Sequence, residues 1–243
     1  MVLKSKNFLA VIIPMYNEEK VADKCIGKVL SFIKKEKDRI VLIAINDGSR
    51  DKTYNILERW RTKEKKYLKV VHHKTNKGYG GAIQTGIREA IRLNFEYCLT
   101  MDSDLTNDPK YIHKFIEESK KGFDVVKASR YMKGSKVVNV PEYRRVVSSI
   151  GNFVASAFFN VGITDCTNGF RMAKTSKLRG MKFKENNFSI ILEEMYILKK
   201  NGSTFSQIPY TLTSRKNSAS HFSYKPKVFY DYFKYAMMAT FLR

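Results

Sequence analysis

Two aspartates separated by one serine, Asp102 and Asp104, follow an apolar run at residues 95–101. The aromatic and aliphatic content of that run predicts a buried strand. At the carboxyl end of a parallel strand, the first loop residues face the crevice where α/β proteins bind ligands. Carboxylates at such a place suit a divalent cation, and Mg²⁺ is usually shared with substrate phosphates. The alternative interpretation is a solvated helix start, because residues 107–109 also resemble a helix N-terminus.

Two earlier strands are predicted to end in polar residues as well. The continuous apolar run at residues 8–13 is typical of a strand covered on both faces, and it leads into a polar turn at residues 16–18. In that turn, Asn17 can cap the helix that follows. A second apolar run, residues 40–45, leads to Asp47. Because the carboxyl ends of parallel strands meet at one edge of a sheet, these polar residues should converge with the two aspartates.

The elements that must position these residues alternate along the chain. Apolar residues at three- and four-residue intervals predict helices between the strands, and the alternation indicates an α/β fold. The expected fold is Rossmann-like: a mostly parallel central sheet with helices on both faces. A glycine-rich stretch at residues 76–82 opens one helix and could cradle phosphate. Its spacing matches neither of the common nucleotide-binding motifs.

The last stretch, residues 227–243, is predicted to form a helix that is apolar over most of its circumference. The residues that interrupt its apolar surface are Lys227, Asp231, Lys234 and Arg243. Two interpretations stay open. The helix packs on the rest of the chain, or it lies in a membrane interface with its basic residues on anionic lipid. We expect one catalytic domain over residues 1–220 and this helix over residues 221–243.

The 243-residue chain carries a formal net charge of +22, which implies anionic partners. Nucleic acid is the least favoured of these partners, because the basic residues are dispersed and no nucleic-acid-binding signature is present. The cysteines lie far apart and indicate buried thiols in a reducing, cytoplasmic setting: Cys25, Cys98 and Cys166. No stretch of the sequence is long and apolar enough for a transmembrane helix.

Seven short motifs occur in an order and spacing that resemble one known family. They are residues 11–18 (VIIPMYNE), 45–49 (INDGS), 76–82 (NKGYGGA), 101–105 (MDSDL), 129–131 (SRY), 164–171 (TDCTNGFR) and 208–209 (IP). With these motifs the chain resembles the family-2 glycosyltransferases of GT-A fold, in particular the dolichol-phosphate mannosyltransferase group, which glycosylates polyprenyl phosphates. The resemblance extends from residue 8 to residue 215.

The resemblance implies a role for each residue that matches a family motif. The residues that would bind the nucleotide sugar are Pro14, Tyr16, Glu18, Asp47, Lys77 and Asp102. Asp102 and Asp104 would coordinate Mg²⁺ or Mn²⁺ on the donor diphosphate. The residues that would bind the acceptor phosphate are Arg130, Arg144 and Arg215. The catalytic residues would be Asp104, Arg215 and Glu194, with the adjacent Glu193 as a rival to Glu194.

The chain also departs from the family pattern. Asn46 stands where the family usually has Asp, and Thr106 stands where a Gln or His commonly adds a metal ligand. Cys166 and Asn168 replace a frequent Pro and a Gly, and residues 215–221 lack the glycine of the family's R-x-x-G-x-S-K segment. These departures concern donor or acceptor specificity rather than the diphosphate site.

The resemblance implies an inverting, metal-dependent transfer of a hexose from a nucleotide sugar to a polyprenyl phosphate, dolichyl or undecaprenyl. The donor would be of the GDP-mannose or UDP-glucose type, and the enzyme would be peripheral on the cytoplasmic face of an anionic membrane. The alternative is a glycosyltransferase of the same fold that acts on a hydroxyl of a glycan or lipid-linked saccharide. A hydroxyl needs a general base, so a carboxylate near the anomeric carbon would favour that alternative. Retention of both aspartates argues against a noncatalytic relative.

Overall fold

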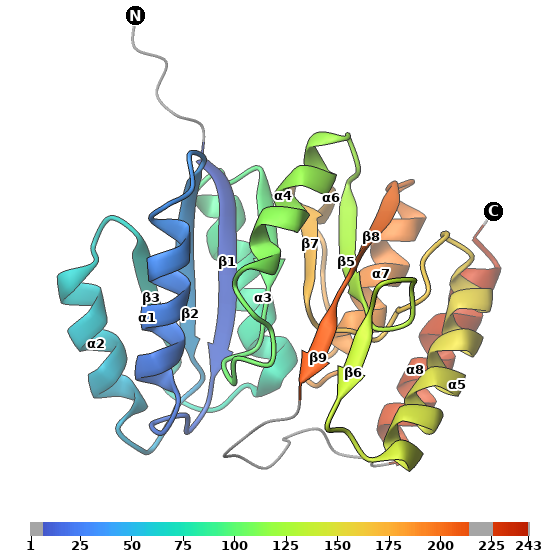
Figure 1. Cartoon of the computed structure of the whole chain (residues 1–243), viewed down its shortest axis with the longest axis horizontal. Helices are drawn as coiled ribbons and strands as arrows, with labels where there is room; N and C mark the ends of the chain where they lie inside the picture. Colours follow the sequence, from blue (N-terminus) through green and yellow to red (C-terminus); the bar gives the residue numbers. More distant parts are fainter. Residues whose placement is uncertain (1–6, 214–225, 243) are drawn as a thin grey trace, which may run out of the picture.

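The computed structural model describes residues 7–213 and 226–242, which form a central sheet between two layers of helices (Figure 1). Within these residues the sheet has seven strands in the order β3-β2-β1-β4-β7-β5-β8. Their bounds are β1 (Asn7–Met15), β2 (Arg39–Asn46), β3 (Leu68–His72), β4 (Tyr97–Thr100), β5 (Val125–Ser129), β7 (Arg171–Lys174) and β8 (Phe205–Pro209). A separate two-stranded sheet pairs β6 (Lys136–Val138) with β9 (Thr211–Thr213).

The main sheet is parallel except at β7. This strand pairs antiparallel with β4 on one side and with β5 on the other, whereas the remaining neighbours pair in parallel. The carboxyl ends of β1, β2 and β4 therefore reach the same edge of the sheet, the lower edge in Figure 1. The predicted mostly parallel α/β sheet with helices on both faces is confirmed.

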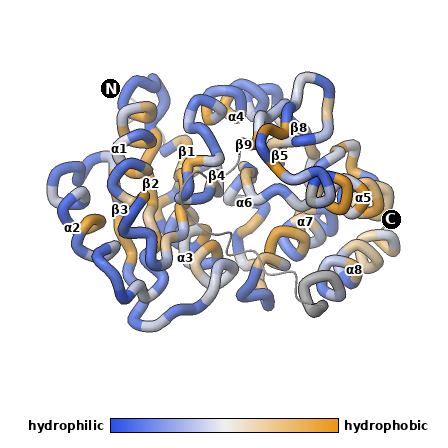
Figure 2. The backbone as a smooth tube through the Cα atoms, turned by 60° about the horizontal axis from the view of Figure 1, so that its bottom comes forward, coloured by the Kyte–Doolittle hydropathy of each residue, from blue (hydrophilic) through white to orange (hydrophobic). Residues whose placement is uncertain are grey.

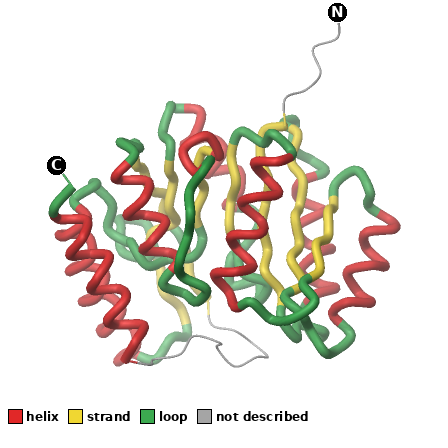
Figure 3. The backbone as a smooth tube through the Cα atoms, turned by 180° about the vertical axis from the view of Figure 1, so that it is seen from behind, coloured by secondary structure: helices red, strands yellow, loops and turns green. Residues whose placement is uncertain are grey.

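Alternate residues of β1 explain why the strand is apolar throughout. Leu9, Val11 and Ile13 face one layer of helices, and Ala10 and Ile12 face the other, all of them fully buried. The first layer comprises α1 (Ala22–Ile33), α2 (Thr53–Lys63) and α4 (Tyr111–Lys120). The second comprises α3 (Gly78–Arg92), α6 (Thr175–Leu178) and α7 (Ile190–Lys200). Figure 3 shows the sheet from behind, with its strands between these helices.

Two further helices, α5 (Glu142–Phe159) and α8 (Pro226–Thr240), lie side by side at the end of the molecule beyond α7 (Figure 1). They pack on α7 through a separate apolar cluster that includes Phe159, Leu192 and Ala236. The predicted C-terminal helix is thus confirmed, while the expected domain boundary at residue 220 lies outside the described residues. Within residues 7–213 and 226–242, no helix combines the length and apolar character needed to cross a membrane.

The expected helix cap at Asn17 is wrong. Helix α1 begins at Ala22, and no side chain caps it. Asn17 instead adopts a positive φ of 54°. Its Oδ1 accepts a hydrogen bond from the Arg50 amide at 2.9 Å, and its own amide donates to Ser49 Oγ at 3.0 Å. The polar side chain therefore joins the loops after β1 and β2 instead of starting a helix.

Candidate active site

A cavity of about 1230 Å³ opens where β1, β2 and β4 end. Of the residues predicted to bind or react, those on its wall are Pro14, Tyr16, Glu18, Asp47, Asp102, Asp104 and Arg130. Lys77 lies between two wall residues, Asn76 and Gly78, at the start of α3. The three polar strand exits therefore meet in one cavity, as a parallel sheet requires.

The loop after β4 is held in shape by its own side chains. Asn107 Oδ1 accepts a hydrogen bond from the Asp102 amide at 2.8 Å. Asp104 Oδ1 accepts hydrogen bonds from the amide and the hydroxyl of Thr106, at 3.0 and 2.7 Å. Helix α4 begins only at Tyr111, so neither aspartate serves as its cap. These bonds fix a turn that presents both carboxylates to the cavity.

A third carboxylate, Glu18, lies beside the two aspartates on the cavity wall. Its Oε1 accepts a hydrogen bond from the Ser103 hydroxyl at 2.8 Å, which ties the end of β1 to the loop after β4. Cys25 is buried nearby, and its pKa is raised by burial first and then by the negative charges of Asp104, Glu18 and Asp102. This concentration of negative charge attracts a cation.

Asp102 and Asp104 fit a divalent cation that is bound together with a phosphate ligand. Both offer hard oxygen donors to the cavity. In the described part of the chain, no three His, Cys, Asp or Glu side chains are grouped to hold a metal ion. Mg²⁺ commonly takes only one or two carboxylates and completes its coordination with water and substrate phosphates. The donor set therefore suits Mg²⁺ or Mn²⁺ on a diphosphate, and not a closed site made of protein alone.

Asp47 lies on the wall at the exit of β2. Its Oδ1 accepts a hydrogen bond from the Lys77 amide at 2.9 Å and from His73 Nδ1 at 2.6 Å. The next residue, Gly48, has a φ of 70°, and a Cβ there would lie 2.6 Å from the amide nitrogen of Asn76. Only glycine allows this close approach. The turn after β2 and the start of α3 thus converge on one carboxylate, and Lys77 contributes through its backbone.

Arg130 is fixed at the cavity wall by a bidentate ion pair. Its Nε and Nη2 donate to the two carboxylate oxygens of Asp165 at 2.7 and 2.8 Å. Burial lowers the pKa of Arg130, but the Asp165 carboxylate raises it more, so the net shift is upward and the side chain stays charged. Nη2 also donates to Thr167 Oγ1 at 2.9 Å. The guanidinium is therefore held rigidly, with part of its charge balanced by Asp165.

Glu194 lies buried beneath the cavity. Its Oε2 accepts a hydrogen bond from Arg171 Nη2 at 2.5 Å, in an ion pair whose side chains are 4% and 2% exposed. The rival Glu193 accepts hydrogen bonds from the amides of Lys184 and Glu185 at 2.8 and 2.9 Å. Neither carboxylate is among the described residues that line the cavity. The structure thus gives both residues structural partners instead of a place on the wall.

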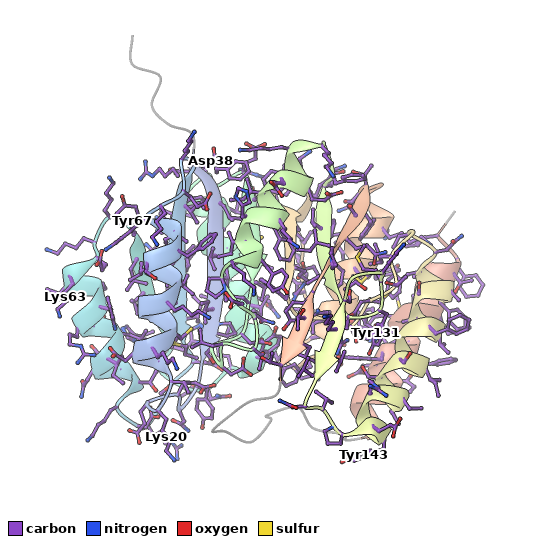
Figure 4. The ribbon with its side chains drawn as sticks, in the orientation of Figure 1. Lys20, Asp38, Lys63, Tyr67, Tyr131 and Tyr143 are labelled. Atoms are coloured by element: carbon purple, nitrogen blue, oxygen red, sulfur yellow. The ribbon has the colours of Figure 1, made fainter. Side chains whose placement is uncertain are left out.

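The predicted Arg215 and the side chain of Arg144 lie outside the described residues. Sequence reasoning missed the neighbouring Arg145, which lines the cavity. Arg145 also forms an ion pair with Glu142 at 3.3 Å and is about half exposed. Reasoning also missed Tyr131, whose hydroxyl donates to Ser148 Oγ at 2.7 Å and links the end of β5 to α5 (Figure 4).

The wall contributed by β9, α5 and α8 is largely apolar. Its apolar residues are Leu212, Val147, Gly151, Val154, Ala155, Tyr232, Phe233 and Ala236, and its polar residues are Arg145, Ser148, Asn152 and Thr213. Large apolar side chains are exposed on the outer surfaces of the two helices and just after α8: Tyr143, Ile150, Phe153, Tyr230 and Phe241. Figure 2 shows the orange of α5 at the periphery of the molecule, and Figure 4 shows Tyr143 at its lower edge. The cavity thus has a carboxylate-rich part and an apolar part, and Val147, Val154 and Phe233 of the apolar part are also exposed to solvent.

Comparisons with known proteins agree with this architecture. The sequence profile of glycosyl transferase family 2 matches residues 10–181. The chain is 28% identical to dolichol-phosphate mannosyltransferase of Pyrococcus furiosus, over 93% of this chain and 62% of that protein. It is 25% identical to polyprenol monophosphomannose synthase of Mycolicibacterium smegmatis, over 88% of this chain and 80% of that protein.

Solved structures share the fold. The glucosyl-3-phosphoglycerate synthase of Mycobacterium tuberculosis, in complex with Mn²⁺, UDP and glucosyl-3-phosphoglycerate, superposes with a TM-score of 0.62. The match covers 89% of this chain and 74% of that chain at 17% identity, which establishes the GT-A fold alone. The family profile covers more than half of the chain, and this protein therefore belongs to glycosyl transferase family 2.

Proposed function

We propose that this glycosyltransferase transfers a hexose from a nucleotide sugar to a polyprenyl phosphate, with inversion at the anomeric carbon. The observation that carries the proposal is the continuity of one cavity from Asp102 and Asp104 to the apolar walls of α5 and α8. A charged donor and a lipid acceptor need both kinds of wall, whereas a glycan acceptor without a lipid needs no apolar surface. The relatives named for dolichol phosphate and polyprenol support the same acceptor class.

The donor would lie at the carboxylate-rich end. Its base and ribose would contact Pro14, Tyr16 and Asp47, and its diphosphate would lie over Asp102 and Asp104, all of which line the cavity. A GDP-mannose or UDP-glucose type of donor fits this placement. The Mn²⁺ and UDP of the M. tuberculosis synthase support a metal-bound diphosphate in this fold. When bound, Mg²⁺ or Mn²⁺ would neutralise the charge that develops on the leaving diphosphate.

The acceptor phosphate supplies its own nucleophile. A phosphate monoester has a second pKa of about 6, so it is largely ionised at pH 7 and needs no general base. Its oxygen bonds to the anomeric carbon while the bond from that carbon to the nucleoside diphosphate breaks, which inverts the configuration. Arg145 lines the cavity and could steer the phosphate, together with the predicted Arg144 and Arg215. Glu194 forms an ion pair with Arg171, and the proposed transfer does not require it as a base.

A polyprenyl phosphate acceptor also implies that the enzyme acts at a membrane surface. A polyprenyl chain leaves a bilayer at a cost of roughly 0.8 kcal/mol per CH₂, so the enzyme must reach the phosphate at the membrane surface. The exposed apolar residues of α5 and α8 and the positive net charge of the chain suit a peripheral position on an anionic surface. The three cysteines are buried free thiols, which fits the cytoplasmic face.

A donor screen with paired acceptors tests the proposal. The chain would be incubated with GDP-mannose, UDP-glucose or UDP-N-acetylglucosamine, and release of GDP or UDP would be measured. Each donor would be tested with a short polyprenyl phosphate and with the matching polyprenol that lacks the phosphate. We expect turnover with one donor and the phosphate only, and a glycosyl phosphate of inverted configuration by NMR. Faster transfer to a glycan or alcohol hydroxyl would establish the alternative instead.

A further inference from the structure

His73, which follows β3, has a place in the donor end that the sequence motifs do not indicate. We infer that His73 is a positioning residue for the donor base: it holds the carboxylate of Asp47 so that one oxygen, Oδ2, is presented to the ligand. The inference rests on the proposed function, because it assumes a nucleotide bound at Asp47.

The imidazole of His73 is enclosed between two partners. Its Nδ1 lies 2.6 Å from Asp47 Oδ1, and its Nε2 lies 3.0 Å from Thr85 Oγ1. The side chains of His73 and Asp47 are both only 4% exposed. The backbone is fixed as well, because the His73 amide donates to the carbonyl of Asn46 at 2.9 Å. The ring therefore has little freedom to turn away from the carboxylate.

The partners determine where the proton of the ring lies. An ionised carboxylate can only accept, so Nδ1 carries a proton and donates it to Asp47. The Thr85 hydroxyl can donate to Nε2 when the ring is neutral. It can also accept from Nε2 and direct its own proton to the Gly81 carbonyl, 3.0 Å away, when the ring is charged. In either state His73 presents an N–H to Asp47.

The arrangement leaves one carboxylate oxygen for a ligand. The Lys77 amide also donates to Oδ1, so both side-chain hydrogen bonds of Asp47 within the described residues reach the same oxygen. Asp47 lines the cavity while His73 does not. Oδ2 can then accept a hydrogen bond from the imide N–H of uracil or the ring N–H of guanine. His73 thus acts on the ligand only through Asp47.

The neighbouring His72 provides a matched control. Its Nδ1 lies 3.0 Å from the side-chain amide nitrogen of Asn46, and its Nε2 lies 2.9 Å from a carboxylate oxygen of Glu58. Its ring also contacts that of Tyr54 in a tilted arrangement with a centroid distance of 4.4 Å, and it does not line the cavity. The two histidines are therefore adjacent in sequence but belong to different networks, and only that of His73 reaches the donor end.

Calorimetric titration tests the inference. UDP, GDP and pyrophosphate would be titrated, with Mn²⁺ present, into the wild type and the variants His73→Phe, His73→Asn and His72→Phe. We expect His73→Phe to weaken binding of the preferred nucleotide about tenfold, the effect of losing a hydrogen bond to a charged group. Its affinity for pyrophosphate, which has no base, should not change. His73→Asn keeps a donor near the Nδ1 position and should recover most of the affinity, and His72→Phe should bind like the wild type.

The outcomes separate this inference from the proposed function. If His73→Phe binds the nucleotide as the wild type does, or loses nucleotide and pyrophosphate equally, the positioning role is overturned. If the wild type binds no nucleotide, the proposed function fails first and the inference fails with it. Should His73→Phe not fold, His73→Gln replaces it, since the Gln amide reaches toward Thr85 and should show the same selective loss.

Discussion

The two ends of the cavity are built on opposite principles. At the donor end, carboxylates are held by backbone amides and short side chains: Asp47 by Lys77 and His73, and Asp104 by Thr106. At the other end, large apolar side chains are more than three-quarters exposed, such as Phe153 of α5 and Phe241 just after α8. The first arrangement is complete before a small charged ligand arrives. The second leaves an apolar surface that indicates an apolar partner.

Removing a carboxylate at the donor end should have the largest effect. We expect Asp104→Asn to lower kcat by at least about a hundredfold, because the leaving diphosphate loses metal-assisted charge stabilisation. Asp108→Asn is the matched control, since Asp108 contacts Lys28 and the Lys110 amide and does not line the cavity. EDTA should abolish wild-type activity and Mg²⁺ or Mn²⁺ should restore it. Full activity in EDTA would contradict the metal role.

Placing negative charges on the exposed apolar surface near α5 and α8 should remove membrane binding without unfolding the protein. We expect the double variant Phe153→Glu, Phe241→Glu to lose co-sedimentation with anionic vesicles that the wild type shows at low salt. Both residues are exposed, so the free energy of unfolding should change by less than about 0.5 kcal/mol. The control variant Tyr54→Glu places a carboxylate at an exposed position of α2 instead, and it should still bind the vesicles. A wild type that stays in the supernatant at low salt would refute the membrane role.

Two glycines test how tightly α3 and α5 are packed. A Cβ at Gly86 of α3 would lie 2.3 Å from Cγ2 of Ile12, whereas a Cβ at Gly151 of α5 would meet nothing within 4 Å. We expect Gly86→Ala to lower the free energy of unfolding by about 1–3 kcal/mol through overpacking. Gly151→Ala should raise it by about 0.5–1 kcal/mol, because alanine favours helix. Chemical denaturation measures both, and equal effects would contradict the described difference in packing.

Lys127, a buried lysine that contacts the 164–171 loop, should give the folded protein a pH-dependent stability. Lys127 Nζ donates to the Asn168 carbonyl at 2.9 Å, and burial above all lowers its pKa from 10.5 to about 7. Between these values the unfolded chain binds a proton that the folded protein does not, so stability should rise with pH. We expect the Tm of the wild type to increase from pH 7 to pH 9 relative to that of Lys127→Met. Parallel Tm profiles would contradict the lowered pKa.

The donor end was largely predictable because its signals are local. Strand exits are visible in the sequence, and a parallel sheet brings them to one edge, as Asp47 and Asp102 show. What could not be predicted depends on distant partners. Glu194 was expected in the site, but its position is set by Arg171, which lies 23 residues earlier in the chain. The polar Asn17 was expected as a cap and instead bridges two loops.

The other end was predictable only in outline. The sequence indicated an apolar C-terminal helix, but not that α5 and α8 lie side by side or that both line the cavity. That Arg145 lines the cavity depends on the rotation of α5 about its axis, which is set by packing against α7 and α8. Helix periodicity fixes the angle between successive residues, whereas the neighbouring elements determine which face of the helix points inward.

The antiparallel strand β7 has a consequence for how the chain folds during synthesis. Strands β3, β2, β1 and β4 can pair as soon as the first hundred residues have left the ribosome. β4 and β5 do not pair with each other, so the free edge of β4 waits for β7, which is made 70 residues later. An open strand edge is a template for pairing with other chains. A translational pause before Arg171 would therefore leave the edge of β4, the strand that leads to Asp102 and Asp104, open to pairing with other chains.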